Sequence, residues 1–138
     1  MNYWLIKSEP FKYSWDEMVN DKTTYWDGVR SYAARIFLYD MKVGDLCLFY
    51  HSNEGKEIVG ITEVVKESYQ DPTTDDERWV AVDVKAVKPL AQAVTLAELK
   101  ADPLLKEMRF VRQSRLSVAP VTAKEFKKVL KISKTTMP

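Results

Sequence analysis

Polar and aromatic side chains gather in two segments near the amino terminus. KSEP, residues 7–10, ends a strand-like segment with a cation, a hydroxyl and a carboxylate, and its proline keeps Glu9 extended. WDGVRSY, residues 26–32, places an indole before a glycine turn, and an arginine and a tyrosine at the start of a helix. The indole of Trp26 supplies a stacking face, and the neighbouring guanidinium of Arg30 supplies hydrogen-bond donors for a phosphate. We expect the turn to present Trp26 outside the core, with core packing as the alternative.

A third group, Tyr50, His51 and Ser52, ends another strand-like segment. His51 falls on the same strand face as Cys47 and Phe49. Two interpretations of His51 stay open: a hydrogen-bonded core histidine, or a polar group at the mouth of a pocket. Neighbouring residues of a strand point to opposite faces, so the adjacency of His51 and Ser52 is no evidence for a hydrolase pair.

Three arginines, Arg109, Arg112 and Arg115, recur every third residue near the carboxyl end. This spacing can gather guanidinium groups on one side. The following LSVAPV, residues 116–121, is typical of a closing strand that stops at Pro120, which places the arginines at the rim of the sheet. We expect them to bind phosphate.

Metal and nucleotide-cofactor chemistry is not expected. One histidine and one cysteine cannot form a metal site based on those ligands. The glycines at 28, 44, 55 and 60 match neither the Walker nor the dinucleotide-binding spacing. We therefore predict no cofactor and no metal, and we expect Cys47 to be a small buried thiol.

Charge is distributed unevenly along the 138 residues, although the net charge is only +1. Residues 109–134 hold eight Lys or Arg and a single acid, Glu125, whereas residues 1–108 hold 13 basic and 19 acidic residues. Such asymmetry indicates a polyanionic partner. For the lysines of residues 124–134, a solvated helix face is the alternative interpretation.

The chain has the length of one domain, residues 1–138, and no run of eighteen apolar residues. Its amino terminus enters a strand-like segment, residues 3–6, without the basic region of an export signal. We expect a monomer, not bound to a membrane, in the cytoplasm of a bacterium or the nucleus of a eukaryote.

Three helix starts share one signature, in which a Ser or Thr cap is followed three residues later by Glu and apolar residues flank the pair. The pairs are Ser14 with Glu17, Thr95 with Glu98, and Thr122 with Glu125. A fourth helix is predicted over Tyr32–Tyr39 from apolar residues at helical spacing.

Strands are predicted where β-branched and aromatic residues cluster. The second and third form a hairpin, since Asn53 and Gly55 tolerate the positive φ of its turn, and Gln70–Arg78 is predicted to be a long mobile loop. Irregular mixing of strands and helices favours an α+β fold with a curved, mostly antiparallel sheet or partial barrel flanked by helices. The four strands span residues 3–7, 45–51, 57–65 and 79–87.

Six motifs, in order along nearly the whole chain, resemble those of the EVE domain family: YWLIKSEP, WDGVRSYAAR, MKVGD, FYHS, IVGITEV and RQSRLSVAPV. The resemblance implies a fold similar to that of the PUA superfamily and its YTH and ASCH branches, in which a mixed sheet forms a pseudo-barrel around a pocket. YTH domains read a methylated adenine with an aromatic cage. EVE domains have been proposed to read modified bases, with cytosine favoured.

The resemblance implies a single ligand pocket. By analogy with the YTH cage, Trp26 would stack on a flipped base, while backbone near Ser8 and Val29 and the side chain of Ser52 would bind its edge. One departure is Ser31, where the family usually has Asn after the arginine of the GVR motif; this shorter side chain bears on the edge-reading contacts and hence on base preference. The implied ligand-binding residues are Lys7, Ser8, Trp26, Val29, Arg30, Tyr32, Tyr50, His51 and Ser52.

The sequence thus favours a nucleic-acid-binding module without catalytic activity, which accommodates a modified base of DNA or RNA and contacts phosphate through basic residues. Two other functions are compatible with these residues. A small hydrolase acting on a base or nucleoside, of the ASCH kind, could use Lys7 and Glu9 as base or acid if both were buried. A protein interaction module would treat the pocket as a peptide groove.

Overall fold

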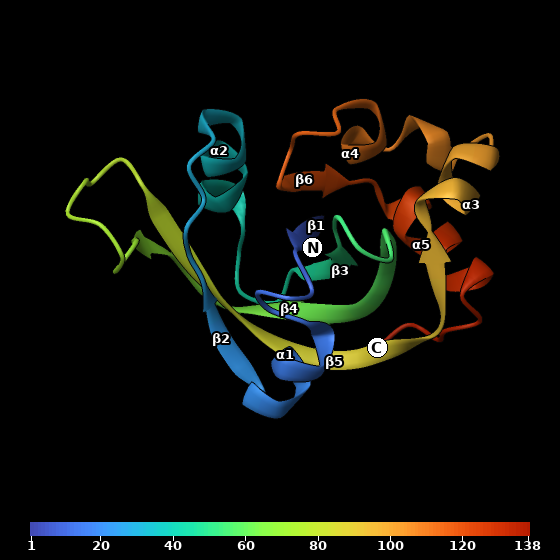
Figure 1. Cartoon of the computed structure of the whole chain (residues 1–138), viewed down its shortest axis with the longest axis horizontal. Helices are drawn as coiled ribbons and strands as arrows, with labels where there is room; N and C mark the ends of the chain where they lie inside the picture. The colour runs from blue at the N-terminus through green and yellow to red at the C-terminus, as the bar shows by residue number, and fades with distance from the viewer.

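The computed structural model describes all of residues 1–138, with a six-stranded sheet at its centre. The strands follow the order β2-β5-β4-β3-β1-β6, and only β1 and β3 are parallel. The long strands β4 and β5 curve beneath β1 and β3 (Figure 1). The strands are β1 (Tyr3–Ser8), β2 (Thr23–Trp26), β3 (Leu46–His51), β4 (Glu57–Gln70), β5 (Val80–Thr95) and β6 (Val118–Val121).

Five α-helices and one 3-10 turn surround this sheet, which confirms the predicted α+β class and the curved mixed sheet flanked by helices. The strand order has two free ends, so the sheet does not close into a barrel. The helices are α1 (Trp15–Asp21), α2 (Tyr32–Asp40), α3 (Leu96–Ala101), α4 (Arg109–Arg112) and α5 (Ala123–Ile132), with the 3-10 turn η1 at Leu105–Glu107.

All three predicted capping boxes are present, at the starts of α1, α3 and α5. In each, the cap hydroxyl accepts from the backbone N–H of the glutamate, whose carboxylate accepts from the backbone N–H of the cap residue. The fourth predicted helix is α2, capped by the side chain of Ser31. These starts were predictable because each depends on two residues only three positions apart.

Strands β4 and β5 are longer than predicted, and β2 was not predicted at all. The register between β4 and β5 shifts four times, which interrupts the two-residue alternation that a sequence pattern relies on. Pro89 pairs with Gly60 next to one of these shifts, where a missing N–H is tolerated. Strand β5 therefore continues past the proline to Thr95.

The predicted closing strand is β6, but it does not stop at Pro120. Pro120 pairs with Trp4 of β1, and the strand runs on to Val121. Because β6 is the outermost strand on this side, a residue without an N–H costs the sheet no inner hydrogen bond.

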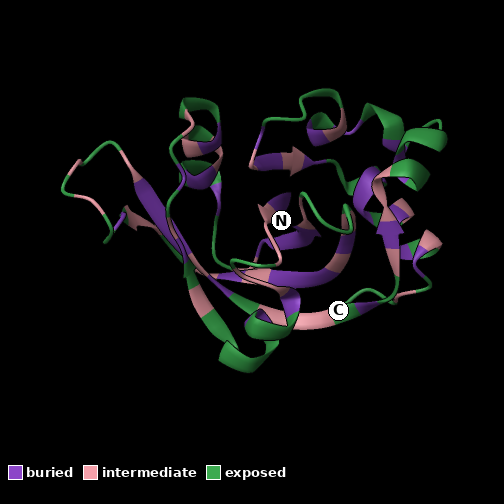
Figure 2. Ribbon diagram, viewed as in Figure 1, coloured by how far each residue is buried: buried purple, intermediate pink, exposed green.

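Each face of the sheet buries its own hydrophobic core, and β3 is almost entirely buried whereas most of β2 is not (Figure 2). Leu48 and Tyr50 of β3 face the first core, which includes Phe126 of α5. Phe49, on the opposite face, packs in the second core, which includes Trp15 of α1. Cys47 also belongs to the second core and is fully buried, as predicted. Successive residues of β3 therefore serve different faces.

Gly60 leaves room for an indole. A Cβ added at this position would lie 2.5 Å from ring atoms of Trp15, and both residues are buried. We expect Gly60→Ala to lower the free energy of unfolding, measured by urea titration, by about 1–3 kcal/mol through overpacking. The same substitution in a Trp15→Leu background should cost much less, because the smaller side chain vacates the space. An equal cost in both backgrounds would contradict this explanation.

Candidate functional site

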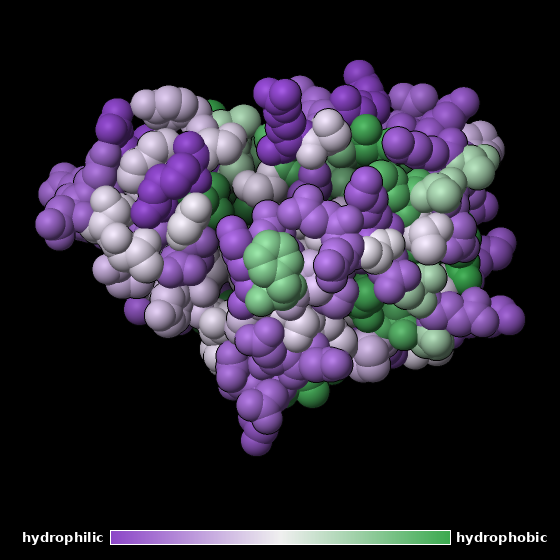
Figure 3. All heavy atoms as spheres, viewed as in Figure 1, coloured by the Kyte–Doolittle hydropathy of each residue, from purple (hydrophilic) through white to green (hydrophobic).

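An open cleft of about 830 Å³, the first cleft, lies at the ends of β1 and β2 and beside the loop that follows β2. Hydrophilic side chains dominate the face seen in Figure 3, with smaller apolar areas between them. The cleft brings together five of the nine ligand-binding residues expected from the sequence: Lys7, Ser8, Trp26, Val29 and Arg30.

Trp26 provides the large aromatic surface of this cleft. It is the last residue of β2 and is only 9% exposed. Its ring meets Phe49 edge-on, with 5.6 Å between the ring centres, and Tyr13 at 6.3 Å. The expectation that a turn presents Trp26 outside the core was therefore wrong, because β2 is a strand and places the indole against the second core. The same indole still lines the first cleft.

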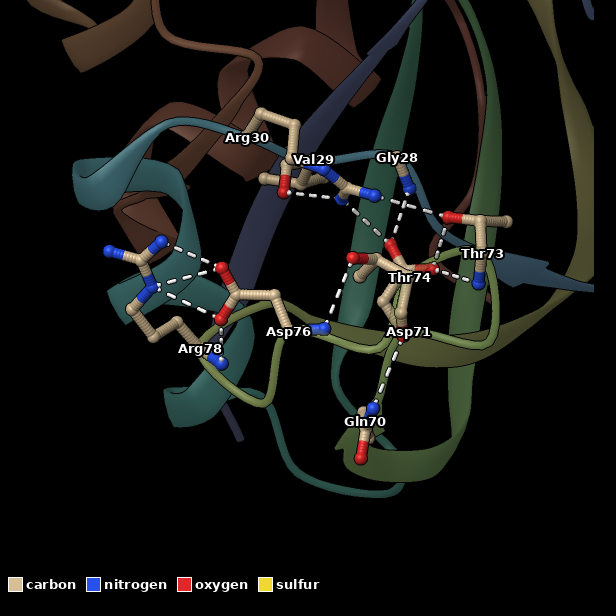
Figure 4. A network of polar contacts seen from close by, with 9 residues as sticks. All are labelled: Gly28, Val29, Arg30, Gln70, Asp71, Thr73, Thr74, Asp76 and Arg78. Atoms are coloured by element: carbon tan, nitrogen blue, oxygen red, sulfur yellow. Dashed lines mark hydrogen bonds and ion pairs between the residues drawn. The ribbon is translucent and has the colours of Figure 1, made fainter.

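A buried carboxylate, Asp71, fixes the loop that follows Trp26 (Figure 4). One of its oxygens accepts from the backbone N–H of Gly28 at 2.8 Å and from the guanidinium of Arg30 at 2.9 Å. The other accepts from the backbone N–H and the hydroxyl of Thr73. Burial by itself raises the pKa of Asp71, but the donors from Thr73, Arg30 and Gly28 outweigh it and lower the pKa to about 2. Asp71 is thus a carboxylate that orders one wall of the cleft.

Asp71 was not among the residues predicted from the sequence, because it lies within Gln70–Arg78, a segment for which the sequence predicted only a long mobile loop. In the structure its backbone N–H donates to Trp79, which closes the loop at its base. The signal present in the sequence was DPT, because an Asp that accepts from a residue two positions later is a common turn former. No local pattern could reveal that the partners include Gly28 and Arg30, more than 40 residues away.

Arg30 is held in place by neighbours rather than free. Besides Asp71, it donates to the carbonyl of Val29 at 3.1 Å and to the hydroxyl of Thr73 at 3.2 Å. Its side chain remains 41% exposed. Arg30 therefore stiffens the loop and still presents part of its guanidinium to the cleft.

Ser8 and Tyr13 shape the opposite wall. The Ser8 hydroxyl donates to the carbonyl of Tyr13, and the Tyr13 hydroxyl donates to Asp21 at 2.8 Å. Burial, together with the Asp21 carboxylate, raises the pKa of Tyr13 to about 12, so it remains a neutral donor at physiological pH. Both walls of the first cleft are thus hydrogen-bonded before any ligand arrives.

Tyr50 and Ser52 do not line this cleft. Together with Lys7 they line a second cavity of about 220 Å³. The expectation of one pocket was wrong for these two residues, because Tyr50 faces the first core whereas Trp26 packs in the second. Lys7, at the end of β1, lines both spaces.

His51 serves the fold. Its Nε2 accepts a hydrogen bond of 3.0 Å from the backbone N–H of Trp15, the first residue of α1. Burial lowers the pKa of His51, which favours the neutral ring that this acceptor role requires. His51 lines neither the first cleft nor the second cavity. Of the two interpretations left open by the sequence, the structure supports the hydrogen-bonded core histidine.

Tyr32 also lies outside the first cleft. It is exposed at the start of α2, with its ring centre 5.4 Å from that of Trp79, and its hydroxyl accepts from Arg78. Tyr32 therefore belongs to an aromatic and arginine cluster on the outer side of the Asp71 loop.

The three arginines expected to bind phosphate lie at or just after α4, and all are exposed. Arg109 donates to Gln113 and lies over the ring of Phe37. The side chains of Arg112 and Arg115 form no hydrogen bond or ion pair. None of the three lines the first cleft, but α4 places Phe110 against the second cavity.

No group of three or more His, Cys, Asp or Glu side chains is arranged to hold a metal ion. No helix combines the length and the apolar composition that crossing a membrane requires. Independence from metals and cofactors stays a prediction, which elemental analysis of the purified protein would test.

Comparison with known proteins gives matches over nearly the whole chain. Residues 2–132 match the family model described as the EVE domain. Thymocyte nuclear protein 1 of Mus musculus is 38% identical over 169 residues, covering 97% of this chain and 74% of the mouse protein. A solved protein structure from Agrobacterium tumefaciens is 45% identical with a TM-score of 0.96, covering 100% of this chain and 97% of that one.

Two further structures were solved with nucleic acid. Human THYN1, in complex with DNA that contains 5-methylcytosine, is 34% identical with a TM-score of 0.90, covering 99% of this chain and 100% of that one. The YTH domain of Zygosaccharomyces rouxii MRB1, in complex with N6-methyladenosine RNA, is 20% identical with a TM-score of 0.60, covering 99% and 88%. The second likeness concerns the fold alone.

Proposed function

The chain belongs to the EVE domain family, and from this premise we propose that it is a nucleic-acid-binding module that accommodates a modified base in the first cleft. The observation that carries the proposal is the pairing of the Trp26 indole with a rigid loop, Gly28–Arg30, on the wall of an open cleft. The indole offers a stacking face, and the loop offers backbone groups for the edge of a base.

The base we propose is a 5-methylcytosine or a related modified pyrimidine. Human THYN1, which covers 99% of this chain, was solved with DNA that contains 5-methylcytosine. A methyl group gains affinity where it leaves water for an apolar surface, and the indole of Trp26 provides one. The side chain of Ser31 caps α2 by accepting from the backbone N–H of Ala34, so its hydroxyl is engaged in the fold.

Binding without turnover is part of the proposal. An acid–base mechanism needs two groups directed at one reacting atom. The ammonium of Lys7 donates to the carbonyl of Ser114, whereas Glu9 pairs with Lys12 at 3.4 Å. Because Lys7 and Glu9 bind different partners, these contacts support a binding module rather than a hydrolase that uses both as acid and base.

A thermal shift screen of modified nucleosides tests the proposal. A ligand that binds only the folded state raises the unfolding midpoint, by an amount that grows with its concentration over Kd. We expect 5-methyl-2′-deoxycytidine to raise the midpoint and 2′-deoxycytidine to do so less at equal concentration. If no nucleoside or oligonucleotide, modified or not, changes the midpoint, the proposed function fails.

Replacing Arg109, Arg112 and Arg115 together by alanine should flatten the salt dependence of nucleic-acid binding. Each lost phosphate contact reduces the slope of log K against log salt concentration by roughly one unit. Arg112 and Arg115 should contribute most, because Arg109 is already bonded to Gln113. An unchanged slope in the triple variant would leave these arginines as solvated surface residues.

We further propose a monomer, located in the nucleus where the organism has one and in the cytoplasm otherwise. The name of the curated mouse relative, a nuclear protein, supports the first of these locations. Light scattering and localisation of a tagged chain test the two statements.

A further inference from the structure

The second cavity is lined by three lysines and by no carboxylate. Its cations are Lys7, Lys56 and Lys100, and the hydroxyls of Ser52 and Ser114 also line it. On the side of the first core, Tyr50 and Phe110 meet edge-on, with 5.0 Å between their ring centres. The cavity therefore joins positive charge and hydroxyl donors to an aromatic wall, a combination unlike that of the first cleft, where acids and bases mix.

The ammonium of Lys7 is only partly satisfied. It donates to the carbonyl of Ser114 at 2.8 Å and lies 5.5 Å from the ring centre of Phe110 and 6.0 Å from that of Tyr50. It forms no ion pair, although an ammonium has three donors. Burial lowers the pKa of Lys7, as expected of a cation that no protein anion compensates. An anion in the cavity would supply that compensation.

The backbone holds the other two lysines in place. The carbonyl of Lys56 accepts from the backbone N–H of Leu96, at 2.8 Å, and so docks the β3–β4 turn on the start of α3, the helix that carries Lys100. Lys56 has a φ of 45°, in the left-handed region that lysine seldom adopts. Neither Lys56 nor Lys100 forms an ion pair.

We propose that the second cavity binds a phosphate group and that this phosphate belongs to the strand whose base enters the first cleft. The second half of this inference rests on the proposed function. Lys7 lines both spaces, and the segment 114–117 separates them, with Ser114 on the side of the second cavity and Ser117 on the side of the first cleft. A nucleotide strand crossing this short divide would place its base and a neighbouring phosphate on opposite sides of Lys7.

A double variant, Lys56→Asn with Lys100→Gln, tests the site while leaving both cleft walls intact. Asn tolerates the positive φ at position 56, and Gln is a good helix former at position 100. The matched control is Lys127→Gln with Lys131→Gln, which removes the same charge from exposed positions of α5 that form no ion pair. Binding of a single-stranded oligonucleotide with one 5-methylcytosine is measured over a range of salt concentrations.

We expect the first double variant to bind the oligonucleotide about tenfold more weakly, the effect of losing about one charge-assisted contact. Its slope of log K against log salt should fall by about 0.7, the value for one phosphate of a single strand. The control should retain the wild-type affinity and slope. If the first variant behaves as wild type, or if both variants weaken equally, the inference is overturned.

Two further ligands separate this inference from the proposed function. The nucleoside 5-methyl-2′-deoxycytidine carries no phosphate, so its affinity should be equal in wild type and in the Lys56→Asn, Lys100→Gln variant. If wild type binds neither this nucleoside nor the oligonucleotide, the proposed function fails. Titration with inorganic pyrophosphate then tests whether the second cavity by itself binds phosphate. Saturable NMR shifts of the Ser52 and Ser114 amides in wild type, absent in the variant, would support a site for free phosphate. No shift in either protein would overturn it.

Discussion

Replacement of Trp26 by alanine is expected to lower the free energy of unfolding by about 3 kcal/mol and to weaken binding of a modified base roughly tenfold to a hundredfold. The first effect follows from burial, since the indole is 9% exposed and packs against Phe49 and Tyr13, and removal of a buried Trp costs about 3 to 5 kcal/mol. We take the lower end because Trp26 also lines an open cleft. The second follows from lost stacking, worth about 1 to 3 kcal/mol per base.

Trp15→Ala is the matched control, because Trp15 is also a buried indole. It packs on Phe49 in the same core, with 5.3 Å between ring centres, but does not line the first cleft. Urea titration and ligand affinity are measured on both variants at a temperature where both remain folded. Loss of affinity in Trp26→Ala alone supports the stacking role, whereas equal loss in both would reduce Trp26 to a structural residue.

Removing the Asp71 carboxylate should have the second largest effect. Asp71→Ala leaves the Gly28 N–H, the Thr73 N–H and the Arg30 guanidinium without their acceptor. A fully buried ion pair that loses one partner costs about 3 to 5 kcal/mol, but Arg30 is 41% exposed, so we expect about 2 kcal/mol. Binding should weaken as well, because the loop that forms one wall of the first cleft loses its anchor.

Asp76→Ala is the control in the same loop. Asp76 pairs with Arg78 at the surface and contacts neither Gly28 nor Arg30, so its removal should change stability and binding little. A variant of Asp71 that behaves like the Asp76 variant would contradict the anchoring role.

The stabilisation of the fold by the Asp71 carboxylate decreases as the pH falls. Its pKa in the fold is about 2, below the ordinary value of 3.8, so the folded state favours the ionised form. This stabilisation is complete above about pH 4 and is lost as the pH falls through about 2. The difference in unfolding free energy between wild type and Asp71→Ala should therefore narrow over that range.

Elements fixed by neighbouring residues could be predicted from the sequence. The starts of α1, α3 and α5 each depend on a cap and a glutamate three residues later, and all three were predicted. Strand β2 and the far half of β5 could not, because β2 is short and its pairing with β5 is a long-range choice that no local pattern records.

The residues of the candidate site also differ in whether their role depends on neighbouring residues or on partners far along the chain. Lys7 and Ser8 were predicted because they end a strand-like segment, and Trp26 because it precedes a glycine turn, and the structure brings all three to one cleft. Tyr50 was assigned to the same pocket, since the sequence shows where a strand ends but not which face of a curved sheet its last residue serves. Asp71 was missed because its role depends on a partner far along the chain.

An equilibrium titration with two single-stranded oligonucleotides, identical except for one methyl group on a central cytosine, tests the proposed function most directly. Single strands avoid the cost of extracting a base from a duplex. A methyl group buried against the Trp26 indole is worth about 0.8 kcal/mol, so the methylated strand should bind about fourfold more tightly at the same salt concentration. The preference should disappear in Trp26→Ala and persist in Trp15→Ala. Equal affinity of the wild-type protein for both strands would contradict recognition of the methylated base in the first cleft.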